Sequence, residues 1–130
     1  MSGRIMILRR LHPSDDEAEA AGRAAELIAA TGREAVLDAD IDWARLRAES
    51  GGYDGAYERV ALAFDGFAII PNLITGTVGR GQYTIADCAI RNGKPVVCWQ
   101  FGQLLRVSHM QVENEGDWKD TYGRAIVRKG

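Results

Sequence analysis

Length, composition and charge favour one globular domain. The chain has 130 residues, of which 46% are hydrophobic and 26% charged, with a formal net charge of −2 at pH 7. That length holds one hydrophobic core, so we expect residues 1–130 to form a single domain. The charges are spread along the chain and give no basic footprint for nucleic acid. No apolar run approaches the roughly 20 residues of a membrane span.

The N-terminal residues and the cysteines predict a cytoplasmic protein. The apolar run from Ile5 to Leu8 is too short for the core of a signal peptide. Cys88 and Cys98 fall within a predicted helix and a predicted strand, where isolated cysteines are typical of reduced core residues. We therefore expect no membrane partner and no disulfide.

The first third of the chain predicts a strand, a helix and a second strand. Ile5 to Leu8 is bounded by charged residues, which is typical of a strand buried on both faces. Ser14 can then cap a helix and Glu17 can reach back to it, which is the capping-box pattern. Apolar residues continue at helical spacing until a glycine predicts the helix end near Thr31. Glu34 to Leu37 predicts the second strand.

The rest of the chain continues this alternation and then departs from it. Apolar spacing predicts helices over 43–49 and 54–64, a strand over 67–70, a glycine-rich loop over 72–81, a helix ending at Gly93, and a strand over 96–99. Strands that alternate with helices predict an α/β fold with a parallel sheet flanked by helices. Two loosely alternating segments, 104–112 and 122–127, predict a final antiparallel pair of strands at the sheet edge.

The residues that follow the predicted strands are mostly polar. In open parallel α/β sheets, ligands bind outside the carboxyl ends of the strands. His12 follows the first strand, Asp38 and Asp40 follow the second, and the glycine-rich loop from Asn72 follows the third. We therefore expect a small-molecule ligand at this edge, contacted by His12, Asn72, Gly79, Arg80, Gly81, Gln82 and Tyr83.

The loop that ends at Gly81 has the features of an anion site. Gly79 and Gly81 can adopt positive φ and bring the backbone close to a ligand. The amides of Gly81, Gln82 and Tyr83 would then point outward at a helix N-terminus, where an anion is favoured. Arg80 between the two glycines suits a phosphate or a carboxylate. The alternatives are a tight loop without a ligand and a solvated arginine.

Two aspartates and one histidine are candidates for acid–base chemistry. Strand alternation sends Asp38 and Asp40 to the same side, where either could bind ribose hydroxyls or act as a catalytic acid or base. Alternatively, Asp40 or Asp42 caps the next helix. His12 could shuttle protons, or it is a solvated loop residue. No set of His, Cys and Asp has metal-ligand spacing, so we expect no metal and no cofactor.

Further residues near the same edge have competing interpretations. Thr84 and Asp87 fit the Ser/Thr-x-x-Asp/Glu capping pattern, so we expect Asp87 to support the helix start and not to act in catalysis. Tyr83, Trp99 and Phe101 could stack on a base, or they could bury a subunit interface.

One succession of strand, glycine-rich loop, helix and Gly-Lys-Pro-Val is similar to that of a known family. Asp65–Pro71, Gly79–Tyr83 and Ala89–Val97 resemble the nucleoside 2-deoxyribosyltransferase-like proteins. Their layout also resembles the nucleoside-monophosphate phosphoribohydrolases of the lysine-decarboxylase-like group. The resemblance runs from about residue 60 to residue 99. It implies a flavodoxin-like sheet, a nucleoside or nucleotide ligand and a homo-oligomer.

The same comparison of motifs exposes a departure from the family's chemistry. The family uses a glutamate in a Gly-Thr-x-x-Glu motif when an N-glycosidic bond breaks. Gly81 matches the glycine of that motif, Gln82 stands for its threonine, and Ile85 stands where the glutamate should be. An isoleucine cannot attack an anomeric carbon or stabilise an oxocarbenium charge.

Three functional hypotheses follow. The leading one is a protein that binds a nucleotide or nucleoside-type ligand without glycosidic chemistry. The second is a deoxyribosyltransferase or N-glycoside hydrolase whose carboxylate is Asp38 or Asp40. The third is an oligomeric interaction protein with a vestigial pocket.

Overall fold

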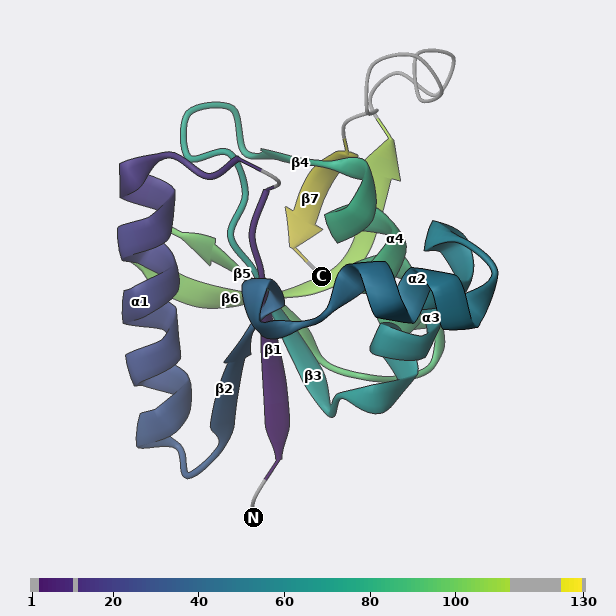
Figure 1. The fold of residues 1–130 in the computed structure, drawn as a ribbon. Coiled ribbons are helices and arrows are strands. Elements are labelled where there is room, and N and C mark those ends of the chain that lie inside the picture. The colour runs from purple at the N-terminus through teal and green to yellow at the C-terminus, as the bar shows by residue number, and fades with distance from the viewer. Residues whose placement is uncertain (1–2, 11, 113–124, 130) are drawn as a thin grey trace.

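The computed structural model describes residues 3–10, 12–112 and 125–129, and for residues beyond Val107 it describes the backbone alone. The predicted α/β class is confirmed, because helices and strands alternate along most of the chain (Figure 1). The elements are β1 Arg4–Leu8, α1 Asp15–Ala30, β2 Glu34–Leu37, a 3₁₀ turn Asp38–Asp40, α2 Trp43–Ser50, α3 Tyr53–Ala63, β3 Gly66–Ile69, β4 Thr77–Val78, α4 Arg80–Arg91, β5 Val96–Gln100, β6 Gln103–Val112 and β7 Ala125–Lys129.

The sheet has the strand order β2-β1-β3-β5-β6-β7-β4. β2, β1, β3 and β5 run parallel to one another, as predicted. The chain moves from β1 outward to β2 and then returns to the other side of β1 for β3, which is the flavodoxin-like arrangement. The connections therefore diverge between β1 and β3, and this topological switch point is where such sheets bind ligands.

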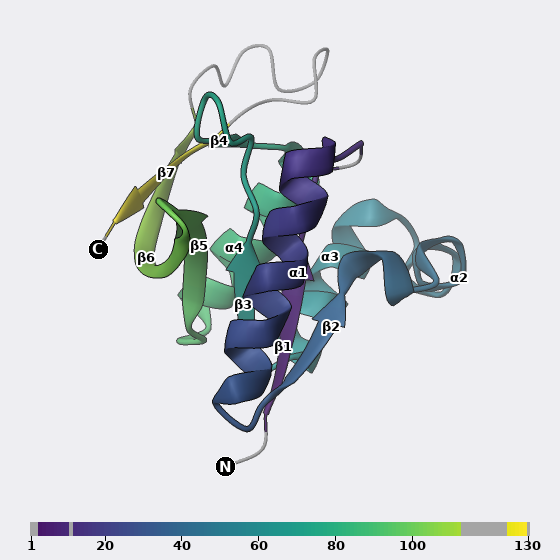
Figure 2. The ribbon, with the colours of Figure 1, turned by 90° about the vertical axis from the view of Figure 1, so that its left-hand side faces the viewer.

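Helices cover both faces of the parallel strands, and successive side chains of β1 separate the two cores. Met6 points into the core under α3 and α4, whereas Ile7 points into the core under α1, and both are fully buried. Figures 1 and 2 show α1 on one side of the sheet and α2, α3 and α4 on the other. Because each face of β1 is covered by an apolar core, the expectation of a strand buried on both faces is confirmed.

The start of α1 follows the sequence signal only in part. Ser14 Oγ accepts a hydrogen bond from the Glu17 amide at 3.2 Å, so the predicted cap is confirmed. The closest partner of the Glu17 carboxylate is Arg10, however, which binds its two oxygens at 2.6 and 2.7 Å, with Ser14 contributing beside it. α2 is capped by Asp42, whose Oδ1 accepts from the Arg45 amide at 3.1 Å, and this decides between the two aspartates considered for that role.

The C-terminal strands extend the sheet by antiparallel pairing. β5 turns into β6 through Phe101 and Gly102, which both have positive φ, the conformation that tight two-residue hairpins require. β6 then pairs with β7, so the predicted antiparallel pair is confirmed, although residues 122–124 of the predicted second strand lie outside the described residues. β7 is not the edge of the sheet, because β4, a two-residue strand within the glycine-rich loop, pairs with it from the outside.

The two cysteines lie in the core. Cys88 and Cys98 are both buried and free, as predicted. Burial raises the pKa of the Cys98 thiol to about 12, so this group stays protonated and acts as a small apolar side chain.

Candidate functional site

A pocket of about 890 Å³ opens at the carboxyl ends of β1, β2 and β3. Its wall is formed by Leu8–Arg10 after β1, by Asp38 after β2, and by Asn72 and residues 77–82 after β3. Residues of α2 and α3 close another side. The pocket therefore lies at the switch point between β1 and β3, as the sheet order requires of a ligand site.

Seven of the nine candidate residues line this pocket. They are His12, Asp38, Asn72, Gly79, Arg80, Gly81 and Gln82. Tyr83 and Asp40 are not among the described residues that form its wall. Prediction of the strand ends was thus sufficient to place most of these residues around one pocket, because parallel strands place their carboxyl ends at one edge.

The two aspartates after β2 do not share a side as expected. The strand stops at Leu37 and continues as a 3₁₀ turn, so alternation no longer applies at Asp38 and Asp40. Asp40 is exposed, whereas Asp38 is partly buried in the pocket wall. The Asp38 carboxylate accepts hydrogen bonds from the Arg9 amide and from Arg9 Nε, both at 3.0 Å. Each of its oxygens is therefore already bound by this arginine.

The glycines of the loop do not serve as expected. Gly79 has φ −79°, and neither Gly79 nor Gly81 adopts positive φ, so that expectation is wrong. The left-handed turn falls at Gly76, with φ 72°. The Asn72 carboxamide holds this turn, because its Oδ1 accepts from the amides of Ile74 and Thr75 at 2.9 and 3.1 Å. The loop is thus shaped by Asn72 and Gly76.

Gly81 is required for a different reason, which is space. It lies in the first turn of α4, where a Cβ atom would come within 3.2 Å of the Tyr57 hydroxyl oxygen. That distance is tighter than ordinary carbon–oxygen contact, so the absence of a side chain allows α3 to bring Tyr57 against the start of α4.

Gln82 ties three backbone segments together beneath the pocket. Its Nε2 donates to the carbonyl oxygens of Leu8 at 3.0 Å, at the end of β1, and of Ile70 at 2.8 Å, directly after β3. Its Oε1 accepts from the Gly79 amide at 2.8 Å, at the start of α4. The residue is only 5% exposed. Gln82 therefore fixes the switch point and the helix start relative to each other.

Three arginines line the pocket, and each has an acidic partner. Arg9 binds Asp38, as described above, and Arg80 lies 3.9 Å from the exposed carboxylate of Asp54. Arg10 makes the closest pair, with Nε and Nη2 at 2.6 and 2.7 Å from the two oxygens of Glu17.

The Arg10–Glu17 pair is anchored in the protein interior. The Glu17 side chain is 4% exposed, whereas that of Arg10 is 33% exposed and reaches the pocket. Burial alone would raise the pKa of the Glu17 carboxyl, but the hydrogen bonds from Arg10 and Ser14 outweigh burial and hold that pKa below its ordinary value. Glu17 therefore stays ionised and orients Arg10.

An aromatic wall, which sequence reasoning missed, faces the same cavity. It consists of Trp43, Tyr53 and Tyr57. The Tyr53 and Tyr57 rings stack with 5.9 Å between their centroids and 25° between their planes, and Trp43 and Tyr57 make a T-shaped contact with 5.9 Å between centroids. Trp43 Nε1 donates to the Asp38 carbonyl oxygen at 2.8 Å, which fixes the wall to the end of β2. The i, i+4 spacing of the tyrosines, after the second strand, was the available signal.

The aromatics that the sequence suggested lie elsewhere. Trp99 is 7% exposed and packs in the core under α1. Phe101 is 88% exposed in the β5–β6 turn. Tyr83 packs against the core between α3, α4 and the sheet. None of the three is among the described residues of the pocket wall.

The two positions of α4 that mattered most in the motif comparison are now placed. Ile85 is 2% exposed and contributes an apolar side chain to the pocket wall. Asp87 lies in the second turn of the helix and binds Arg91 at 3.0 Å. The predicted capping role of Asp87 is therefore wrong, because α4 begins earlier, at Arg80, with Gly79 as its N-cap.

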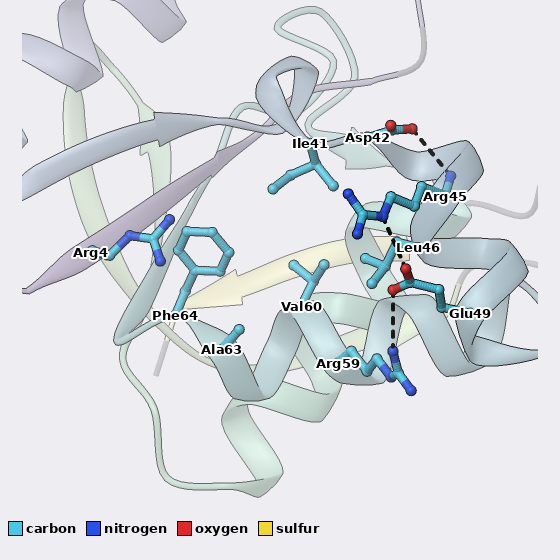
Figure 3. A pocket seen from close by; sticks show the side chains of 10 residues that line it. All are labelled: Arg4, Ile41, Asp42, Arg45, Leu46, Glu49, Arg59, Val60, Ala63 and Phe64. Atoms are coloured by element: carbon cyan, nitrogen blue, oxygen red, sulfur yellow. Dashed lines mark hydrogen bonds and ion pairs between the residues drawn. The ribbon is translucent and has the colours of Figure 1, made fainter.

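A second depression, of about 480 Å³, lies between the start of β1 and helices α2 and α3 (Figure 3). Its floor is apolar and includes Val60 and Phe64, and arginines from three elements surround it. Glu49 lies between Arg45 and Arg59, at 3.0 and 3.9 Å from their guanidinium nitrogens. None of the candidate residues lines this depression. The strand that contributes to its described wall is β1, through Arg4 at the amino end of that strand.

Neither a protein-family model, nor a curated protein, nor a solved structure matches the chain. Among the described helices, none is both long and apolar enough to cross a membrane. Within the same part of the chain, no three His, Cys, Asp or Glu side chains gather as a metal ion would need. The function is therefore inferred from the residues of the switch-point pocket.

Proposed function

We propose that the switch-point pocket binds a nucleotide or nucleoside-type ligand without breaking its glycosidic bond. The observation that carries this proposal is the presence of an aromatic wall and three guanidinium groups in one cavity at the switch point. Aromatic side chains can stack on any nucleobase, because every base has a π-face. Guanidinium groups form paired hydrogen bonds with phosphate oxygens.

The size and the helix start support the same ligand class. A cavity of about 890 Å³ is within the range of small-molecule sites. The first turn of α4 forms part of the wall through Arg80 and Gly81, and the first amides of a helix have no partners within the helix. This end of α4 favours an anion, and Arg80 adds a positive charge beside it.

The proposal excludes glycosidic chemistry because of the side chains at the reacting positions. Ile85 occupies the position of the family glutamate and lines the pocket. Asp38 reaches the cavity, but Arg9 binds both of its oxygens. A carboxylate held in this way is less available to attack an anomeric carbon or to take a proton from water.

Ligand binding is tested with purified protein and a panel of nucleosides and their 5′-monophosphates, by thermal shift and calorimetry. We expect at least one of them to raise the melting temperature, because a ligand that binds only the folded state stabilises it. Arg80→Ala should lower the affinity roughly 10-fold or more, since it removes a charge-assisted hydrogen bond. Arg59→Ala, at the second depression, is the matched control and should bind as the wild type does. A panel without any binding would contradict the proposal.

The second candidate, an N-glycoside hydrolase or deoxyribosyltransferase, is kept because Asp38 lines the pocket. Chromatography of the same mixtures detects released base. Release by the wild type and its loss in Asp38→Asn, with an unchanged melting temperature, would favour this enzyme over the binding protein. Binding without release would favour the proposal, and a protein that neither binds nor releases would leave the interaction hypothesis.

A further inference from the structure

Tyr57 lines the switch-point pocket in a position that two aromatic neighbours hold. Its ring stacks with that of Tyr53 and makes a T-shaped contact with that of Trp43. Trp43 is itself bound to the backbone of Asp38, and Tyr53 Oη accepts from Arg47 Nη1 at 3.0 Å. Two aromatic neighbours therefore orient the Tyr57 ring, and little rotational freedom remains to be lost when a ligand binds.

The hydroxyl of Tyr57 points at the beginning of α4. A Cβ atom at Gly81 would lie 3.2 Å from the hydroxyl oxygen and 3.4 Å from the ring carbon that carries it. Arg80 is the neighbouring residue, and its positive charge acts on the Tyr57 hydroxyl. Gly81 thus provides the space that brings an aromatic hydroxyl against the start of α4, beside residue Arg80 in the pocket wall.

This hydroxyl is open to the pocket. Within the described part of the chain, no hydrogen bond engages Tyr57 Oη. The fully buried side-chain polar atom without a partner in that part is Ser50 Oγ, so Tyr57 Oη is not fully buried. Tyr57 is only partly buried and lines the cavity, so a ligand can reach its oxygen. Burial and the neighbouring Tyr53 raise its pKa above the ordinary value, so the group carries its proton at neutral pH.

We infer that the Tyr57 hydroxyl, placed by Gly81, is a ligand-binding group that donates a hydrogen bond to an oxyanion of the bound molecule beside Arg80. This inference rests on the proposed function, because it assigns one contact within the same pocket. A protonated phenol donates well to a phosphate or carboxylate oxygen, and a donor that is already oriented costs little entropy to use. Arg80 supplies the positive charge that attracts the oxyanion, and the oriented Tyr57 hydroxyl supplies a hydrogen-bond donor.

The first test is Tyr57→Phe, which keeps the ring and removes the hydroxyl. Calorimetry with the 5′-monophosphate that the wild type binds most tightly should show an affinity at least about 10-fold lower. The melting temperature without ligand should stay within about 2 °C of wild type, because no protein group loses a partner. An unchanged affinity would overturn the inference, and so would a large loss of melting temperature in the free protein, which would indicate a structural role.

The second test uses Gly81→Ala in both backgrounds as a double-mutant cycle. In the wild type, the added methyl group displaces the hydroxyl, so affinity should again fall at least about 10-fold. In Tyr57→Phe the crowded oxygen is absent, so the same substitution should change affinity by less than about threefold. Equal losses in the two backgrounds would show that Gly81 acts through something other than the hydroxyl and would overturn the inference.

Inorganic phosphate separates failure of this inference from failure of the nucleotide proposal. If no nucleoside or nucleotide binds but phosphate binds the wild type, and binds Tyr57→Phe about 10-fold more weakly, the oxyanion contact stands and the nucleotide proposal fails. If nucleotides bind and Tyr57→Phe binds them equally well, the nucleotide proposal stands and the contact fails. If phosphate and the nucleotides all fail to bind, both are overturned.

Discussion

The two depressions of the molecule use the same side chains in different ways. Each has an apolar floor and several arginines that are paired with carboxylates. At the switch point, Glu17 is 4% exposed and holds Arg10 through two short hydrogen bonds. In the second depression, Glu49 is 49% exposed and its arginine partners are more exposed still. A pair that is anchored in the interior presents its arginine in one orientation, whereas a solvated pair does not.

The backbone around the switch-point pocket is also more firmly anchored than the backbone around the second depression. The ends of β1 and β3 and the start of α4 meet at the switch-point pocket, and the buried Gln82 side chain joins all three. The second depression lies beside α2, an eight-residue helix with no buried residue. A ligand site needs groups that are fixed before the ligand arrives, because ordering them afterwards lowers affinity. Rigidity, more than composition, distinguishes the two regions.

The largest expected effect comes from Gln82→Leu. Leucine has a similar volume, but it removes the hydrogen bonds to two carbonyl oxygens and one amide, of which the Leu8 oxygen keeps the Ile70 amide as a partner. Loss of these hydrogen bonds should lower the free energy of unfolding by about 3 kcal/mol. Urea unfolding followed by circular dichroism measures this value.

Gln103→Leu is the control for that substitution. Gln103 is exposed at the start of β6, so the same change of side chain there should alter stability by less than about 0.5 kcal/mol. If the two variants were equally stable, Gln82 would not fix the switch point, and the contrast between the two depressions would lose its main support.

The next largest effect is expected for Glu17→Gln. The amide keeps the shape of the side chain but removes the charge that holds Arg10, whose guanidinium is partly shielded from water. We expect a loss of about 2 kcal/mol in the free energy of unfolding, measured by the same urea titration. A variant as stable as the wild type would place this pair in the class of solvated surface pairs.

Much of this fold could be predicted because its signals are local. The apolar run at Ile5 to Leu8 and the cap at Ser14 depend on neighbouring residues, and both are confirmed. Parallel strands also place their carboxyl ends together, so His12, Asp38 and Asn72 could be assigned to one edge without knowledge of any contact. Hydrophobic periodicity and the positions of polar residues were therefore sufficient to predict these features.

The remainder depends on contacts between distant residues. Both carboxylate oxygens of Glu17 bind Arg10, a contact that the capping pattern at Ser14 does not specify. β4 pairs with β7 across 47 or more residues, and a two-residue strand has no periodicity to detect. Asp38 and Asp40 separate because the chain enters a 3₁₀ turn directly after Leu37, so the alternation of an extended strand does not continue to Asp40. The aromatic wall needed knowledge of how α2 and α3 fold back over the end of β2.

The pH dependence of stability gives a smaller effect that isolates the charge on Glu17. Its pKa in the folded protein lies below the ordinary value of 4.5, although burial alone would raise it, because the bonds from Arg10 and Ser14 prevail. The unfolded chain therefore binds more protons as pH falls below about 5, and the stability that Glu17 contributes is present above its unfolded pKa and lost below it. The difference in melting temperature between the wild type and Glu17→Gln should narrow between pH 5 and pH 3. A melting-temperature difference that stayed constant over this pH range would show that the charge of Glu17 does not stabilise the folded protein.

The smallest effect is expected for Glu49→Gln, the matching substitution at the second depression. Its contacts with Arg45 and Arg59 lie at 3.0 and 3.9 Å between side chains that are largely in water. Pairs of this kind contribute little, because solvent screens them and both side chains must be ordered to form them. The melting temperature should stay within about 2 °C of wild type at both low and moderate salt. A loss as large as that of Glu17→Gln would mean that the arginines around this depression are also held in place, and the second depression would then have the fixed geometry that we assign to the switch-point pocket.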